Sequence, residues 1–123
     1  IQLKLEQQAV PRVAMGANQV KQIFFNLLRN AVDAMSQGGI LTVRTDLTSD
    51  RKWVELRVSD TGTGILPELR EKIFHLYFTT KDHGTGLGLF LCRRLAREQG
   101  GDIRVESEKD KGSTFIVTLP VEE

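Results

Sequence analysis

Apolar and polar residues follow two different periods along this chain, and these periods predict its helices and strands. Between positions 19 and 35 the apolar residues recur at intervals of three and four, the spacing of a helix with one buried face. Asn18 precedes most of this segment and is expected to cap the helix. Shorter helices are expected at 68–76 and 87–99. Alternating patterns predict strands at 1–8, 40–45, 54–59, 103–107 and 114–119.

These elements predict one fold class. Helices at three places against a single sheet of about five strands, mixed and largely antiparallel, predict an α/β two-layer sandwich with the helices on one face. The last two strands are expected to pair as a hairpin across the turn at 110–112. The segment 78–88 is polar and rich in glycine, so it is interpreted as a mobile loop. All 123 residues are expected to form one domain, 1–123.

Composition narrows the function classes. Seventeen Lys and Arg residues against sixteen Asp and Glu residues give a net charge of +1, so the chain has no field that would attract nucleic acid. Cys92 is the single cysteine, which excludes an internal disulfide, and the leucines around it favour a core position over a reactive thiol. No apolar run reaches the ~18 residues of a membrane span, and a cytoplasmic location is expected. The chain begins with Ile1 rather than Met, so we expect it to be a piece of a longer protein.

A polar stripe runs beside the apolar face of the long helix. At ~100° per residue, Asn26, Asn30 and Asp33 fall within about 60° of one another. Amides at the rim of a buried face need partners, and one interpretation is that they bond to neighbouring backbone. The other is that they supply oxygen ligands to a cation. A neutral Asn holds Mg²⁺ only together with substrate phosphates, so this interpretation predicts a metal that arrives with a nucleotide.

A glycine-rich corner, Asp60-Thr61-Gly62-Thr63-Gly64, follows the strand at 54–59. It is either a plain turn or a place where a flat ring approaches backbone that lacks side chains. In the second case the Asp60 carboxylate would accept a hydrogen bond from the exocyclic amino group of adenine. Guanine presents a carbonyl oxygen at that point, so such a site would prefer ATP to GTP.

A second glycine-rich stretch, Gly84-Thr85-Gly86-Leu87-Gly88, opens the helix predicted at 87–99. Free N–H groups and the positive end of a helix dipole favour phosphate at such a position. The spacing is neither that of a Walker A loop nor that of a dinucleotide fingerprint. By itself the stretch is a weak signal.

Taken in order, these motifs resemble the ATP-binding domain of two-component sensor histidine kinases. Their superfamily includes type II topoisomerases, heat-shock chaperone ATPases and mismatch-repair ATPases. Segment 26–31 resembles the family's asparagine box, 60–64 its first glycine box, 73–81 its phenylalanine box, 84–89 its second glycine box and 112–115 its terminal strand motif. The resemblance covers essentially the whole chain and implies a Bergerat-type ATP-binding fold. The Asn-Ala-Val-Asp-Ala-Met and Phe-Thr-Thr-Lys sequences look most like the nitrogen-regulation type of sensor kinase.

The resemblance implies roles for individual residues. Asn30 would be the Mg²⁺ ligand with Asn26 beside it near the phosphates. Asp60 would bind the adenine amino group, Thr114 would support Asp60 or a bridging water at the ring, and Lys81 would approach the γ-phosphate. Asn26 and Lys81 are thereby the catalytic candidates, and ATP and Mg²⁺ the cofactors. The implied nucleotide-binding set comprises the polar stripe of the long helix, the first glycine box, the lid and the terminal strand motif: Asn26, Asn30, Asp33, Asp60, Gly62, Gly64, Ile65, Thr79, Thr80, Lys81, Gly84, Thr85, Gly86, Leu87, Gly88 and Thr114.

The chain departs from the family pattern at two places. Asp33 stands where many members carry a Lys that contacts phosphate, and Thr79-Thr80-Lys81 replaces an Arg, a role in which we expect Lys81 to substitute. In the superfamily's hydrolases, a glutamate one helical turn before the Mg²⁺ asparagine activates water. Asn26 stands there in this chain, and an amide has no useful basicity. We therefore expect phosphoryl transfer to a nucleophile supplied elsewhere rather than rapid hydrolysis.

The nucleophile is expected on another domain. In the family, a histidine followed by an acidic residue accepts the γ-phosphate, whereas His75 and His83 are followed by Leu76 and Gly84. The resemblance implies a phosphoacceptor histidine domain that precedes Ile1, a homodimer formed through that missing segment, and a response regulator downstream. The implied enzyme is a protein-histidine kinase whose autophosphorylation needs the missing domain.

Two other functions stay open. One is a kinase of the same fold that phosphorylates serine on an anti-sigma-factor antagonist, and an intact gene that starts near residue 1 would favour it. The other is a nucleotide-sensing interaction module with a degenerate site, and failure to bind ATP would favour that one.

The predicted lid can be tested by amide exchange. We expect the backbone amides of 78–88 to exchange quickly without nucleotide and to become protected with an ATP analogue, because a glycine-rich loop orders over the phosphates that it wraps. Hydrogen–deuterium exchange with and without the analogue measures this. Equal exchange in the two states would contradict a lid.

Overall fold

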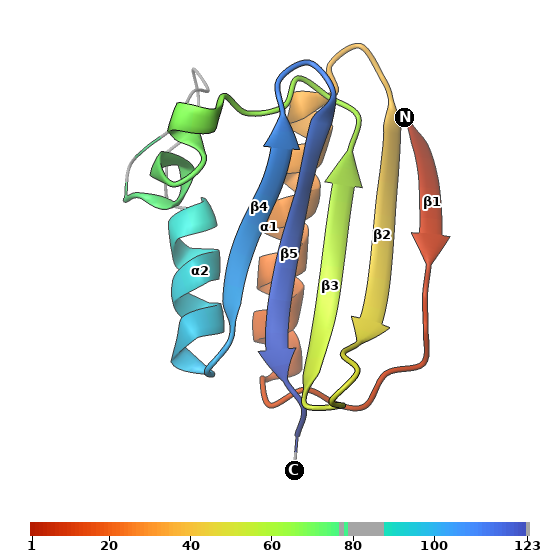
Figure 1. Ribbon diagram of the computed structural model, residues 1–123, viewed down its shortest axis with the longest axis vertical. Helices are drawn as coiled ribbons and strands as arrows, with labels where there is room; N and C mark the ends of the chain where they lie inside the picture. Colours follow the sequence, from red (N-terminus) through yellow and green to blue (C-terminus); the bar gives the residue numbers. More distant parts are fainter. Residues whose placement is uncertain (77, 79–87, 123) are drawn as a thin grey trace.

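The sheet is the frame of the molecule. The computed structural model describes residues 1–76, 78 and 88–122, and within them five strands form one sheet in the order β1-β2-β3-β5-β4 (Figure 1). β1 runs parallel to β2, and all other neighbours are antiparallel. The predicted mixed sheet and the β4–β5 hairpin are therefore confirmed. The strands are β1 (Gln2–Glu6), β2 (Ile40–Leu47), β3 (Trp53–Asp60), β4 (Asp102–Glu108) and β5 (Gly112–Pro120).

Helices cover one face of this sheet, and Figure 1 shows α1 behind the central strands and α2 beside β4. Helix α1 spans Ala17–Ala34 and α2 spans Gly88–Glu98. Helix α1 begins earlier than predicted, with Gly16 at its N-cap, so the expectation that Asn18 caps it is wrong. None of the helices in the described residues is long and apolar enough to cross a membrane.

The third helical segment differs from the helix expected at 68–76. It consists of two short 3₁₀ helices, Pro67–Leu69 and Lys72–Phe74. Arg93 of α2 holds this segment in place, because its guanidinium lies 4.5 Å from the centre of the Phe74 ring and 3.2 Å from the Glu71 carboxylate. Such short turns follow from packing contacts of this kind rather than from helix periodicity. The two-layer fold class nevertheless stands as predicted.

The core lies between the sheet and the apolar face of α1. Ile23, Leu27 and Ala31 lie one helical turn apart, and each is almost completely buried. They pack in one cluster with Val58 of β3 and Phe115 of β5. Burial of each large side chain of this kind stabilises the fold by about 1.5–3 kcal/mol, so the apolar residues that give the helix its periodicity also stabilise the fold.

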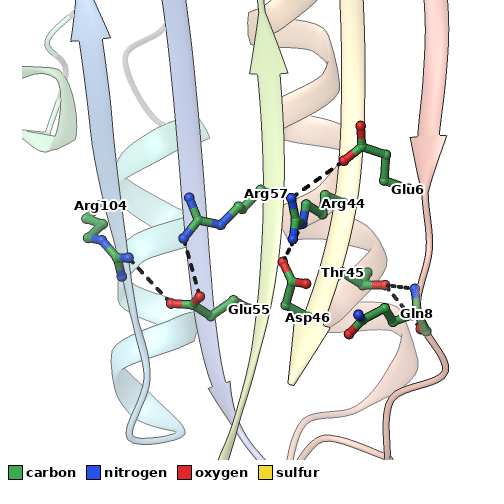
Figure 2. Close-up of polar contacts among 8 residues, drawn as sticks. All are labelled: Glu6, Gln8, Arg44, Thr45, Asp46, Glu55, Arg57 and Arg104. Atoms are coloured by element: carbon green, nitrogen blue, oxygen red, sulfur yellow. Dashed lines mark hydrogen bonds and ion pairs between the residues drawn. The ribbon is translucent and has the colours of Figure 1, made fainter. Parts of the chain in front are cut away.

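The opposite face of the sheet is polar. Figure 2 shows Glu55 accepting hydrogen bonds from Arg57 and Arg104, at 3.4 Å each. Ile116 lies between these two arginines in the strand register and is fully buried, because their long stems flank it. Charged pairs of opposite sign thus cover the open face. Neighbouring residues of a strand point to opposite faces, and this decides which side of the sheet each residue near the end of β3 occupies.

Candidate nucleotide-binding site

Asp60 is the last residue of β3, and its side chain lies on the helix-covered side of the sheet, two positions after Val58. Its exposed fraction is only 6%. Oδ1 accepts a hydrogen bond of 2.9 Å from the Gly62 N–H, whereas the buried Oδ2 has no hydrogen-bond partner among the described residues. A buried carboxylate oxygen without a donor costs free energy, and a ligand N–H would satisfy it.

Burial sets the electrostatics of this carboxyl. It raises the pKa of Asp60 above its ordinary value, and the backbone N–H groups of Gly62 and Ser113 oppose that rise. Among the described residues the groups that oppose the rise are neutral backbone donors, and Oδ2 remains available to a donor group of a ligand.

Two serine hydroxyls continue the polar site across the sheet. Asp60 pairs with Ser113 in the strand register, and Ser113 pairs with Ser107, so all three side chains lie on the same side. The Ser113 and Ser107 hydroxyl oxygens are 2.8 Å apart. Ser107 also donates to the Gly112 carbonyl, at 3.0 Å, so the proton between the two serines belongs to Ser113. The Ser113 oxygen keeps lone pairs that can accept a hydrogen bond.

Thr114 lies on the other side of the sheet. Its register partner is Ser59, and the two hydroxyl oxygens are 2.8 Å apart. The expectation that Thr114 supports Asp60 is therefore wrong, and Ser113 occupies that position. The sequence offers two adjacent hydroxyl residues in Ser113-Thr114, and only the register with β3 selects between them, because neighbouring residues of a strand point to opposite faces.

The glycines that follow Asp60 are required by the protein's own backbone. A side chain on Gly62 would collide with the Ala34 carbonyl at the end of α1. Gly64 has a φ of +70°, and a side chain there would collide with the Glu108 carbonyl of β4. The first glycine box is thus held between the end of α1 and the end of β4. That these glycines also pass beneath a ring stays a prediction.

Asn26 lies where α1 meets the beginning of α2. Its Nδ2 donates to the Gln22 carbonyl at 2.9 Å, and its Oδ1 would lie 3.1 Å from a Cβ placed on Gly88, the first residue of α2. Gly88, where the predicted loop and the predicted helix overlap, is helical and adjacent to Asn26. Asn30 is half-buried one turn further along the same flank, and Asp33, at the next position of the predicted stripe, is exposed.

Cys92 lies against the same helix contact. It is completely buried, and its thiol donates a weak hydrogen bond to the Ile23 carbonyl, with the sulfur 3.9 Å from the oxygen. Burial raises the pKa of the thiol to about 12, although a hydrogen bond with Asn26 opposes this rise. The thiol stays protonated at neutral pH. The interpretation of Cys92 as a core residue is confirmed.

Helix α1 spans the distance between the two glycine boxes. Its end, at Ala34, contacts the loop after Asp60, and Asn26 contacts the start of α2. Ala34 comes eight positions after Asn26, which corresponds to about 12 Å along the helix axis. Ile65 is half-buried against the core, and its N–H donates to Ser107 at 2.8 Å. The remaining predicted site residues lie outside the described residues: Thr79, Thr80, Lys81, Gly84, Thr85, Gly86 and Leu87.

Comparison with known proteins places this arrangement in a family. Residues 15–123 match the family model of histidine kinase-, DNA gyrase B- and HSP90-like ATPases. The chain belongs to this family. Sporulation kinase C of Bacillus subtilis is 40% identical over 104 residues, which are 85% of this chain and 24% of that protein. Sensor histidine kinase ZraS of Escherichia coli is 38% identical over 112 residues, which are 91% of this chain and 24% of that protein.

Solved structures agree with the sequence comparison. The catalytic domain of histidine kinase ThkA superposes with a TM-score of 0.85 and 35% identity, over 97% of this chain and 79% of that one. Full-length ShkA in complex with AMPPNP superposes with a TM-score of 0.79 and 26% identity, over 98% of this chain and 26% of that one. The predicted histidine kinase ATP-binding domain is confirmed. The chain spans about a quarter of the curated relatives named above, and the nitrogen-regulation type stays a prediction.

The buried carboxyl makes the stability of this ATPase domain depend on pH. Because the folded-state pKa of Asp60 is raised, the folded chain binds this proton more tightly than the unfolded chain does. The free energy of unfolding therefore falls as pH rises from the ordinary Asp value through the folded-state pKa. We expect Asp60→Asn, without nucleotide, to raise the free energy of unfolding at neutral pH and to have a smaller effect near pH ~4, where more of the unaltered side chain is protonated.

Urea denaturation at the two pH values measures this effect. Asp110→Asn is the matched control, because Asp110 is exposed and Asn also tolerates its positive φ of 67°. An Asp60→Asn protein less stable than the parent at neutral pH would show that the buried carboxylate is compensated within the protein.

Proposed function

We propose that this chain binds Mg-ATP and presents the γ-phosphate to a histidine on a separate domain, as the ATP-binding part of a sensor kinase. The observation that carries the proposal is the buried Asp60 Oδ2, which has no donor in the described part of the chain and stands beside the Ser113 hydroxyl. The two side chains lie on the helix-covered side of the sheet at the end of β3, where the first glycine box begins.

The chemistry of these two side chains favours adenine. The exocyclic amino group of adenine donates a hydrogen bond that the Asp60 carboxylate accepts, and a water or a ring nitrogen can bond to the Ser113 hydroxyl. Guanine would place a carbonyl oxygen against the carboxylate, and both groups would be acceptors. An unsatisfied pair of this kind costs on the order of 1–3 kcal/mol, so the site discriminates ATP from GTP.

The phosphate end is supported by α1 and α2. Asn26 of α1 lies next to Gly88, the first residue of α2. The free N–H groups at this end of α2 and the helix dipole favour anionic oxygens. Asn30, half-buried one turn away, would hold Mg²⁺ through its amide oxygen, with the remaining positions filled by phosphates and water. When bound, the ion would neutralise charge on the phosphates. The roles of Lys81 and the other lid residues remain part of this proposal.

Transfer is favoured over hydrolysis by the residue at position 26. The Asn26 amide donates to the Gln22 carbonyl through Nδ2 and has no basic atom with which to activate water. A site of this kind positions the phosphoryl group and stabilises its charge while another group attacks. The nucleophile is then supplied by a phosphoacceptor domain, and a response regulator receives the phosphoryl group afterwards. Curated relatives named as sensor kinases support this histidine-directed version.

Adenine recognition is tested with three substitutions. Asp60→Asn is expected to weaken binding of a non-hydrolysable ATP analogue by roughly 1.5–3 kcal/mol, the range for a hydrogen bond to a charged group. Ser113→Ala is expected to weaken binding by a smaller amount, about 0.5–1.5 kcal/mol. Thr114→Val, on the other face of the sheet, is the matched control and should bind like the parent. Calorimetric titration measures all three, and GTP is expected to bind weakly to the parent.

Unchanged affinity in Asp60→Asn would remove Asp60 from the nucleotide site. A larger loss in Thr114→Val than in Ser113→Ala would contradict the assignment of the two hydroxyls to opposite faces.

The metal role is tested at Asn30. We expect Asn30→Ala to bind the ATP analogue without the enhancement that Mg²⁺ gives to the parent, because the amide oxygen is the protein's own ligand. Asn18→Ala, an exposed amide in the first turn of the same helix, is the control. Titrations with and without Mg²⁺ give the ratio of affinities for each protein. A retained metal effect in Asn30→Ala would contradict the assignment.

A further inference from the structure

The outer edge of β1 is open and flat. In the part of the chain that the structure describes, β1 is a terminal strand of the sheet, paired only with β2, and all five of its residues are exposed. The Gln2 N–H donates to the carbonyl of Gly39, the residue before β2, at 2.8 Å. Successive residues of a strand direct their backbone groups to alternate sides, so the N–H and C=O groups of Leu3 and Leu5 point away from the sheet. These groups are available to another strand.

Side chains on β1 do not block such pairing. β1 contains no proline and no bulge, which are two of the common protections of an edge strand. Leu3 and Leu5 are 56% and 57% exposed and lie on the helix side of the sheet, where Figure 1 shows no helix behind β1. Lys4 and Glu6 lie on the open side, where Glu6 reaches Arg44 at 3.7 Å (Figure 2). The edge thus combines unpaired backbone groups, an apolar row and charges of both signs.

We infer that β1 pairs in an antiparallel manner with β1 of a second copy of this chain, with Leu5 facing Leu5 across a two-fold axis. In this register Lys4 faces Glu6 of the partner subunit, and Glu6 faces Lys4 of the partner subunit, so both charges meet an opposite charge. Registers centred on Lys4 or on Leu3 do not pair each charge with an opposite charge. Centring on Lys4 brings two lysines together, and centring on Leu3 places Lys4 against Gln2 of the partner subunit.

The geometry of the pair agrees with the backbone directions. Because the Leu5 backbone groups point outward, Leu5 and its symmetry mate exchange both of their N–H···O=C bonds. Lys4 and Glu6 then form the closer, non-hydrogen-bonded pairs, in which cross-strand charges interact most directly. The axis runs perpendicular to the sheet, so the two helix layers lie on the same side and a continuous sheet forms across both copies. Strand β2 separates β1 from β3 and Asp60, and no residue of β1 belongs to the proposed nucleotide site, so this inference does not depend on the proposed function.

A charge-swap cycle tests the register. We expect the parent chain to form a weak, reversible dimer in sedimentation equilibrium. Lys4→Glu and Glu6→Lys should each raise the dissociation constant about ten-fold, because each replaces two attractive pairs by two repulsive ones. The double variant Lys4→Glu/Glu6→Lys should restore the parent value to within about three-fold. ATP-analogue binding in all three variants reports that the fold is intact.

A proline substitution tests the backbone pairing. Leu5→Pro removes an N–H that points outward and no hydrogen bond to β2, so it should abolish the dimer and leave analogue binding unchanged. Amide exchange in the parent should show protection of Leu3 and Leu5 that grows with protein concentration. A chain that stays monomeric at all concentrations overturns the inference and leaves the edge to another polypeptide. A dimer that survives the single charge changes, or that leaves these two amides unprotected, overturns it as well.

Discussion

The close backbone contact between the loop after β3 and its two neighbours is the constraint on which the candidate site depends. Gly62 lies against the Ala34 carbonyl, and Gly64 lies against the Glu108 carbonyl, with no room for a side chain at either place. Two further bonds close the same contact: the Thr63 N–H donates to Ala34 at 3.1 Å, and the Asp110 N–H donates to Thr63 at 2.7 Å. The loop therefore couples the end of α1 to the β4–β5 turn, and it begins directly after Asp60 at the end of β3.

This constraint explains why a carboxylate can remain buried at the end of a strand. The loop turns so that the Gly62 N–H returns to Asp60 Oδ1, which supplies one donor and leaves Oδ2 without one. Burial without a full set of donors costs stability. Free energy lost at a single buried carboxyl is consistent with a group kept for binding rather than for folding, because an apolar residue would fill the same space at lower cost.

The two faces and the β1 edge of the sheet differ in the residues and backbone groups that they present. The helix-covered face carries the core and, at its end, the row of Asp60, Ser113 and Ser107. The open face carries ion pairs between exposed or half-exposed side chains, which contribute little to stability and keep that face solvated. The edge at β1 has unpaired backbone groups and therefore differs from both faces. The two faces differ because neighbouring residues of each strand point to opposite sides of the sheet.

Much of the fold could be predicted from local pattern. The period of α1, the alternation of the strands and the order of the glycine-rich motifs indicated the elements, the fold class and the family, because each is carried by neighbouring residues. Local pattern failed where tertiary contact decides conformation. The segment around Phe74 forms short 3₁₀ turns in place of the predicted helix, and Arg93 of α2 contacts both that ring and Glu71. Helix propensity does not include such contacts.

The sequence by itself determined which residues are the candidates for the chemistry: the asparagines of α1, Asp60 and the glycines. Tertiary structure alone decided how the described ones are arranged. It placed Ser113 rather than Thr114 beside Asp60, because the register between β3 and β5 selects the face of each strand residue. It also showed that Gly62 and Gly64 are required by backbone contacts between segments far apart in the chain. Residue types are written in the sequence, whereas register and burial arise only when distant segments pack together.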